Sequence, residues 1–357
     1  MKNKNIMAYK EKISPFVYNN TSISLFSIKM LVLLFIQILL LIFTKSYQAL
    51  YVILASLGGA VVVSLINIFK YKSSFYTNSS FIIQGILIGM LLPESYPLIT
   101  AFSLVLVILF FEKFYYFDSV NNWLNVVCFT VAIAWFIGKD FFPHFLVTRD
   151  ILSVKNPSSY MIQNGVFPVY NFDARITGFL NGTIFSVLKV NLPAGYISIL
   201  WDTHSVIPAF RFNLVTILSS VILFAEDNFM LNLTRSLFVI VYSVLVRLFF
   251  PLMNGGAFNQ GDVLLALLTS GTLFFAVFII NWYGTYPVTH IGKILYGIVC
   301  GVTAFFVVGC GTSPIGMVYT VLIGNVVNLL IRLVEEKNNQ ARIVRIVANA
   351  VESGELK

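Results

Sequence analysis

The sequence predicts an all-α polytopic membrane protein with about ten transmembrane helices. Hydrophobic residues make up 58% of the 357 residues, charged residues make up 11%, and the mean hydropathy is +0.87. A soluble domain is far less apolar than this. Many apolar runs approach the roughly 20 residues that a helix needs to cross a bilayer, and short polar segments separate them. The chain is therefore expected to cross the lipid repeatedly.

The net charge of +8 is explained by membrane topology rather than by nucleic-acid binding. Lys and Arg gather mainly near the two ends of the chain and between the apolar runs. Because cytoplasmic segments carry an excess of these residues, both termini are predicted to be cytoplasmic, which requires an even number of crossings. We expect a multi-pass protein of the cell inner membrane, with the lipid bilayer as a partner and no nucleic acid.

The first membrane half is predicted over residues 28–137, after a cytoplasmic segment of residues 1–27. Its five spans are Ile28–Phe43, Ala49–Phe69, Phe81–Leu92, Leu98–Phe111 and Trp123–Ile137. The third run has about 12 residues, or about 18 Å as a helix, which is less than the roughly 30 Å hydrocarbon core. It is either a tilted span or a half-helix. Its Gly85 and Gly89 would let another helix backbone approach closely.

Residues 138–178 are the longest segment without a spanning run, and residues 138–206 are predicted to form a loop and a half-helix on the outer face. The polar stretch Asn171–Pro193 leads into a short apolar run, Ile184–Leu192. If this run crossed the membrane, the C-terminus would lie outside. We therefore expect a half-helix that is buried against protein, because irregular backbone is not tolerated in lipid.

The second membrane half is predicted over residues 207–333. Its five spans are Ile207–Phe224, Leu237–Phe250, Val263–Ile280, Lys293–Val308 and Ile315–Leu333. Five crossings on each side of the loop return the C-terminus to the cytoplasm. Residues 334–357 are expected to form a cytoplasmic tail, with a short amphipathic helix that anchors it to the membrane surface.

Soluble-type catalysis is not expected, because the chain has no nucleotide-binding loop and no catalytic-triad signature. The three His residues are scattered between apolar runs, so no metal site is predicted. Asp262, at a membrane edge, is either a functional acid or a helix cap. The small residues Ser270 and Gly271 lie in mid-span and permit close helix contact or a ligand. Together with Thr289 they are the candidates for an ion or redox path.

Two motifs carry a resemblance to a known family. Residues 261–271 read Gly-Asp-Val-Leu-Leu-Ala-Leu-Leu-Thr-Ser-Gly, and residues 285–289 read Thr-Tyr-Pro-Val-Thr. They resemble Gly-Asp-Leu-Leu-Leu-Ala-Leu-Leu-x-Gly-Gly and Thr-Asp-Pro-Val-Thr in the RnfD/NqrB family. This is the membrane component shared by the Rnf electron-transport complex and the sodium-translocating NADH:quinone reductase. The likeness covers roughly Ser14 to Leu333, although Tyr286 replaces the acidic residue. It implies two inverted five-helix halves with short half-helices, a fold similar to that of urea channels.

The resemblance also implies FMN, joined through its phosphate to a threonine of an Asp-x-x-Ser-Gly-Ala-Thr segment in the outer loop. Asp173 begins the counterpart in this chain, and two alignments compete. An alignment anchored on Ile176-Thr177-Gly178 places the acceptor at Leu180, where no ester can form. An alignment anchored on Leu188-Lys189 matches Gly182 and Thr183 to the end of the motif.

We expect Thr183 to be the position equivalent to the flavin anchor, with a cap of a half-helix as the alternative role. The residues expected near the flavin are Gly182, Asp173, Lys189 and Asp202. Lys189 is compatible with contact to a flavin phosphate or a quinone carbonyl, whereas extension of its side chain to the membrane surface is the more common role of such a lysine. Riboflavin is a second flavin that the resemblance allows.

The function implied by the resemblance is that of a membrane subunit in an Rnf/Nqr-like ion-translocating complex. Such a subunit holds FMN, takes electrons from a flavin-bearing partner on the outer face, and passes them on with movement of Na⁺ or H⁺. The other subunits of the complex are its expected partners. The alternative is a flavin-free solute channel or transporter with a urea-channel-like fold, which the altered acceptor spacing favours.

Overall fold

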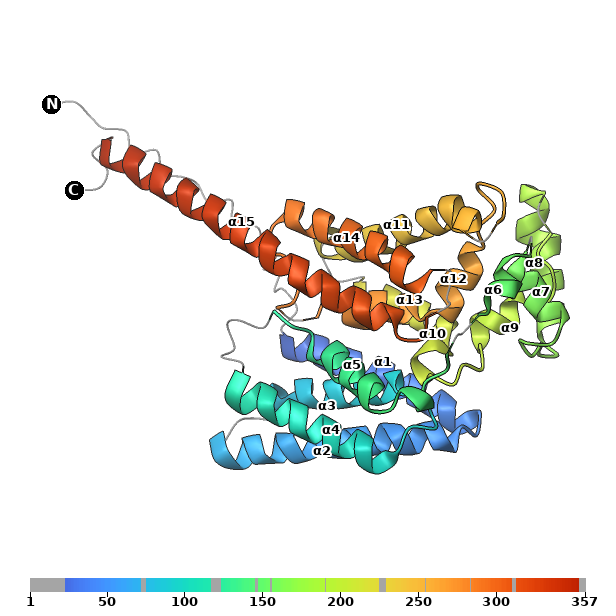
Figure 1. Ribbon diagram of the computed structural model, residues 1–357, viewed down its shortest axis with the longest axis horizontal. Coiled ribbons are helices and arrows are strands. Elements are labelled where there is room, and N and C mark those ends of the chain that lie inside the picture. The colour runs from blue at the N-terminus through green and yellow to red at the C-terminus, as the bar shows by residue number, and fades with distance from the viewer. Residues whose placement is uncertain are drawn as a thin grey trace, which may run out of the picture.

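The computed structural model describes residues 23–71, 75–116, 123–144, 147–154, 156–189, 191–224, 229–253, 255–282, 284–309 and 313–352. Every regular element within these ranges is a helix. The helices form a bundle with a group of short helices at one end and a long helix that projects from the other (Figure 1). Residues 1–22 of the predicted cytoplasmic segment and residues 353–357 of the tail lie outside the described residues.

The first half contains five helices. They are α1 (Ile23–Phe43), α2 (Tyr47–Tyr71), α3 (Phe75–Leu91), α4 (Leu98–Phe111), which continues as a π-helical turn, Glu112–Tyr116, and α5 (Val126–Ile137). Helix α3 has 17 residues, or about 26 Å, so the third run is longer than its apolar residues alone predict. A Cβ atom on Gly85 would lie 2.5 Å from Cβ of Ala60 in α2, which confirms the expected close helix approach.

The predicted second half contains the following elements within the described residues. They are α10 (Asn213–Phe224), α11 (Phe229–Met253), α12 (Val263–Thr269), α13 (Thr272–Phe274), a π-helical turn (Phe275–Ile279), α14 (His290–Val308) and α15 (Gly316–Glu352). Helix α14 packs against α11 and α15, as α4 packs against α2 and α5 in the first half. The two halves meet where α1 touches α10 and where α5 touches α15. Such contacts are expected if the halves are related by a two-fold axis, and that relation stays a prediction.

In the described part of the chain, five helices are long and apolar enough to cross a membrane: Leu25–Phe43, Tyr47–Lys70, Asn232–Met253, His290–Val308 and Gly316–Arg345. Three further apolar helices, Asn78–Leu91, Val126–Ile137 and Asn213–Phe224, are shorter. The chain is therefore an all-α polytopic membrane protein. The total of ten crossings stays a prediction.

The predicted span Val263–Ile280 is not one helix. Helix α12 ends at Thr269, and Gly271 then takes a left-handed conformation with φ of 72° before α13 begins. Two carbonyl groups of this broken segment are satisfied by side-chain amides from other helices. Asn213 donates to the carbonyl of Leu268 at 2.8 Å, and Asn125 donates to the carbonyl of Ile279 at 3.2 Å. Irregular backbone at membrane depth requires such protein donors.

Helix α15 differs from the prediction at its C-terminal side. The tail is helical as far as Glu352, but this part is not a short helix of its own, because α15 runs for 37 residues without a break from the membrane segment into the tail. Its attachment to the membrane surface stays a prediction. At 1.5 Å per residue α15 is about 56 Å long, well beyond the roughly 30 Å hydrocarbon core. The red end of the ribbon in Figure 1 stands clear of the bundle.

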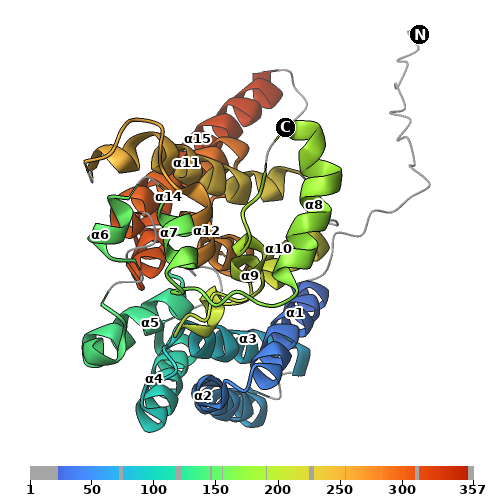
Figure 2. The ribbon, with the colours of Figure 1, turned by 90° about the vertical axis from the view of Figure 1, so that its right-hand side faces the viewer.

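The described residues of the segment between the halves form four α-helices: α6 (Arg149–Leu152), α7 (Pro157–Gln163), α8 (Asp173–Leu188) and α9 (Tyr196–Trp201). They lie together at one end of the bundle, which we call the loop end, opposite to the projecting end of α15 (Figures 1 and 2). The expected buried half-helix at Ile184–Leu192 is wrong. Ile184 and Val187 lie at the end of α8 with 56% and 81% of their surface exposed, and Pro193 ends the apolar run without a helix.

Candidate functional site

Asp173 fixes the start of α8 against α9. Its carboxylate is fully buried and accepts four hydrogen bonds. The donors are the Thr177 hydroxyl at 3.0 Å, the Gly195 amide at 2.7 Å, and the amide and hydroxyl of Ser198, both at 2.7 Å. Burial alone would raise the pKa of Asp173, but the bonds from Gly195, Ser198 and Thr177 outweigh it and lower the pKa below its usual 3.8. Asp173 is therefore held as an anion.

This arrangement predicts acid-sensitive packing at the loop end. Because the folded-state pKa of Asp173 is depressed, its stabilising contribution is present above pH 3.8 and is lost as the pH falls through the lower folded value. Near-ultraviolet circular dichroism of the purified protein should report this loss, since Tyr170, Phe172 and Trp201 form an aromatic cluster beside it. Asp173→Asn should weaken the packing by about 1–3 kcal/mol at neutral pH. If this variant keeps the full acid transition, the transition belongs to another group.

Asp202 forms a buried ion pair with Arg211. The Arg211 Nε lies 2.9 Å from one carboxylate oxygen of Asp202, and Nη2 lies 2.5 Å from the other. The third nitrogen of the guanidinium group, Nη1, donates to the hydroxyl of Ser46 in the turn between α1 and α2. Asp202 also accepts the backbone amide of His204 at 2.8 Å. These bonds tie the loop end to the first membrane half, and both carboxylate oxygens are used within the protein.

Asp262 connects the broken segment to the loop helices. Its Oδ1 accepts the amide of Leu265 at 3.0 Å and so caps α12, as the cap interpretation predicts. Its Oδ2 accepts the amide of Ser158 in α7 at 2.9 Å. The hydroxyls of Ser158 and Ser159 lie 2.8 and 2.9 Å from the Tyr196 hydroxyl in α9. Asp262 thereby joins α12 to α7 and, through these hydroxyls, to α9.

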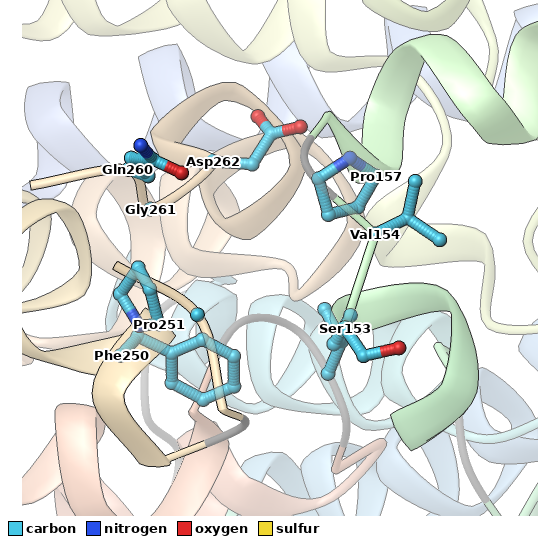
Figure 3. Close-up of a pocket in the computed structure, with 10 residues that line it drawn as sticks. Ser153, Val154, Pro157, Phe250, Pro251, Gln260, Gly261 and Asp262 are labelled. Carbon is cyan, nitrogen blue, oxygen red and sulfur yellow. The ribbon is translucent and has the colours of Figure 1, made fainter. Parts of the chain in front are cut away.

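A cavity of about 340 Å³ opens beside Asp262 (Figure 3). The connection between α6 and α7 lines one side of it with Ser153, Val154 and Pro157. The opposite side consists of the end of α11 and the turn that precedes α12. This side includes Phe250, Pro251, Gly256, Gln260 and Gly261. The volume suits a small ligand.

Ser270 and Gly271 form the break at the end of α12, the helix that Asp262 caps. The Ser270 hydroxyl bonds to the carbonyl of Ala266 and to the hydroxyl of Thr272. A Cβ atom on Gly271 would lie 2.1 Å from the ring of Phe210, which follows the Asp202 segment in the chain. The loop end therefore rests on the broken helix. Thr289 is not part of this region, because it caps α14 and bonds to Glu335 of α15 toward the opposite end.

Thr183 and Gly182 lie on the exposed side of α8. The Thr183 hydroxyl donates to the carbonyl of Phe179 at 2.7 Å, and no atom lies within 4 Å of a Cβ atom built on Gly182. Helical spacing places Thr183 on one face with Ile176, Phe179 and Val187, which are exposed apolar residues. The competing acceptor position, Leu180, lies on the same face one turn earlier. The two alignments therefore place the flavin anchor on neighbouring turns of α8.

Lys189 ends α8 in a left-handed conformation with φ of 54° and an exposed side chain. Its position at a helix C-terminus is favourable for a cation. The structure therefore brings Asp173, Asp202, Asp262 and the break into one connected region. It leaves Lys189 and Thr183 on the outside of that region.

The family model described as the NQR2, RnfD, RnfE family matches residues 10–340. The chain belongs to this family. A search of curated proteins finds no match. Family membership makes the chain a membrane subunit of an Rnf/Nqr-type complex, which assembles with other subunits.

The structure gives physical reasons for the Gly-Asp motif of this NQR2/RnfD/RnfE family member. A Cβ atom on Gly261 would lie 2.0 Å from the carbonyl oxygen of Val246, so only glycine lets this turn meet α11. Arg247 of α11 donates to the Gly261 carbonyl at 3.0 Å. Asp262 then caps the half-helix. The motif thus builds the junction between α11, the turn and α12.

Sequence reasoning missed two residues that organise this region. Arg211 lies nine positions after Asp202, and an isolated cation at the edge of an apolar run is a signal for such a partner. Tyr196 bonds to two serines 37 and 38 residues away, and no local pattern marks that contact.

Proposed function

We propose that this family member is the redox subunit of its complex and that it carries FMN on α8 through Thr183. It would take electrons from a flavin-bearing partner at the loop end, on the outer face of the membrane. Their passage would be coupled to movement of Na⁺ or H⁺. The observation that supports the proposal is an accessible hydroxyl in the middle of an exposed apolar helix face.

The residues of α8 fit such a group. Among the residues that the structure describes, the Thr183 hydroxyl is bonded only to its own helix backbone, and the space beside Gly182 is open. Phe179 and Val187, 67% and 81% exposed, offer apolar surface of the kind that a flat aromatic ring covers. The bonds of Asp173 hold α8 in a fixed position, so a group on this face would stand at a defined place. When bound, flavin supplies electron transfer.

The proposal predicts a covalent flavin that depends on Thr183. Purified protein in a denaturing gel should fluoresce under ultraviolet light, and Thr183→Ala should abolish the signal because the ester cannot form. Ser186→Ala is the matched control. Ser186 is exposed on the same helix and also bonds to the helix backbone, so its removal should leave the fluorescence unchanged. Fluorescence that persists in Thr183→Ala would contradict this attachment.

The ion step would use the break at Ser270 and Gly271, where buried hydroxyls of Thr269 and Thr272 also lie in the membrane segment. The broken helix equally suits the flavin-free channel. A second experiment separates the two functions. Co-purification with other redox subunits from native membranes is required by the redox function, whereas a channel is isolated alone and colourless.

A further inference from the structure

A second cavity lies far from the loop end, between the end of α4 and the start of α5. Its volume is about 410 Å³, and its lining is apolar and aromatic except for one carboxyl group. The lining residues are Ile108, Phe111, Glu112, Trp123, Leu124, Val126 and Phe129. The Glu94 amide, just before α4, donates to the carbonyl of Val206, which follows α9. The first residues of α4 therefore lie near the loop end, and its last residues lie away from it.

The cavity is a groove at the apolar surface of α4 and α5, which we expect to face lipid. Phe111 and Phe129 line it and are 54% and 39% exposed, on the outer sides of α4 and α5. Glu112, by contrast, is only 8% exposed. A ligand that enters from the bilayer would therefore meet two aromatic rings before it reaches the carboxyl group.

One carboxylate oxygen of Glu112 accepts no hydrogen bond from the described part of the chain. The Gln84 amide of α3 donates to its Oε1 at 3.1 Å. Its Oε2 and the Oε1 of Gln84 are buried and have no hydrogen-bond partner among the residues that the structure describes. The charge of the adjacent Lys113 acts on this carboxyl group, but no salt bridge or hydrogen bond between the two side chains is found among the described residues. An unpaired carboxylate at a buried position is costly, and two neighbouring acceptors remain open for a ligand that donates.

We propose that this groove binds a primary ammonium group carried on an apolar chain, with Glu112 as its counter-ion. An ammonium group has three donors, enough for the open oxygens of both Glu112 and Gln84, whereas an alcohol has one. The rings of Phe111, Trp123 and Phe129 attract a cation through their faces. The groove accommodates the first part of the apolar chain. Two sources have this chemistry, a lipid with an ethanolamine head group and a free amine amphiphile. The proposal is independent of the flavin.

The test uses the full-length protein in nanodiscs of phosphatidylglycerol, which contain no ammonium group. Dodecylamine and its neutral counterpart dodecanol are titrated, and binding is followed by the part of the tryptophan fluorescence change that Trp123→Phe removes. Glu112→Gln should weaken dodecylamine binding at least about ten-fold and leave dodecanol binding unchanged, because a charge-assisted bond is lost. Glutamine retains the size of the side chain, and size-exclusion chromatography verifies that the variant is folded.

Two aromatic variants of α5, one inside the groove and one outside it, test whether dodecylamine binds in the groove. Phe129→Ala should weaken dodecylamine binding about five-fold. Phe136→Ala, which removes an exposed aromatic residue of the same helix outside the groove, should have no effect. Phosphatidylethanolamine added to the discs should reduce the affinity for dodecylamine if the lipid is the ligand, and leave it unchanged if a free amine is. Equal weakening in Phe136→Ala, or a folded Glu112→Gln with unchanged affinity, would overturn the proposal.

Discussion

Gly271→Val should prevent the broken helix from forming and leave little folded protein in the membrane. Two effects add at this position. A β-branched residue does not tolerate a φ of 72°, and its Cβ atom would meet the Phe210 ring at 2.1 Å. We expect the free energy of unfolding to fall by about 4 kcal/mol or more. The clash is removed only if the Phe210 ring moves away from its place beside the break. The yield of monodisperse protein and its apparent Tm in detergent measure this loss.

Gly255→Val is the control for the backbone effect alone. Gly255 also has a positive φ, of 80°, but no atom lies within 4 Å of a Cβ atom built on it. Its variant should cost about 1–2 kcal/mol and still fold. If both variants behave alike, the contact with Phe210 is not the reason for glycine at the break.

Arg211→Met should destabilise the contact between the loop end and the first membrane half by about 3–5 kcal/mol. The change leaves the Asp202 carboxylate buried, 1% exposed, without its cation. It also removes the bond to Ser46, so the loop end loses its tie to the turn between α1 and α2. Faster proteolysis at the loop end and a lower apparent Tm are the expected observations.

The double variant Arg211→Met with Asp202→Asn tests the cause. Removal of the charge on Asp202 should recover part of the stability, because no buried carboxylate is left unpaired. Arg175→Met is the matched control, since Arg175 is exposed on α8 and should change little. If the double variant is less stable than Arg211→Met alone, the charge of Asp202 has another partner.

The membrane helices follow from the sequence because lipid demands long apolar runs. Predicted and observed bounds of α14 share the same last residue, Val308, and α3 exceeds its predicted length because Asn78 and Ser79 are buried within it. A span that contains buried polar residues therefore appears shorter in the sequence than it is in the structure. The apolar run marks only the apolar part of the helix, and whether polar residues continue the helix depends on the other helices that pack against them.

The break and the start of α8 cannot be derived in the same way. Residues Val263–Ile280 are continuously apolar apart from a few small polar residues, and the interruption depends on amides of Asn213 and Asn125 that are distant in the sequence. Helix α8 begins at Asp173 because Gly195 and Ser198 donate to its carboxylate from 22 and 25 residues away. Such long-range bonds leave no local pattern, whereas the cap at Asp262 is readable because its partner, Leu265, is three residues on.

Because α15 is uninterrupted, we expect it to move as one rigid rod. Its residues from Asn325 to Glu352 include neither glycine nor proline, so no hinge separates the part packed against α14 and α5 from the projecting part. A small tilt of the packed part is therefore magnified at the free end. Movements at the contact between the two halves would reach any subunit that touches this end as a larger, sideways displacement.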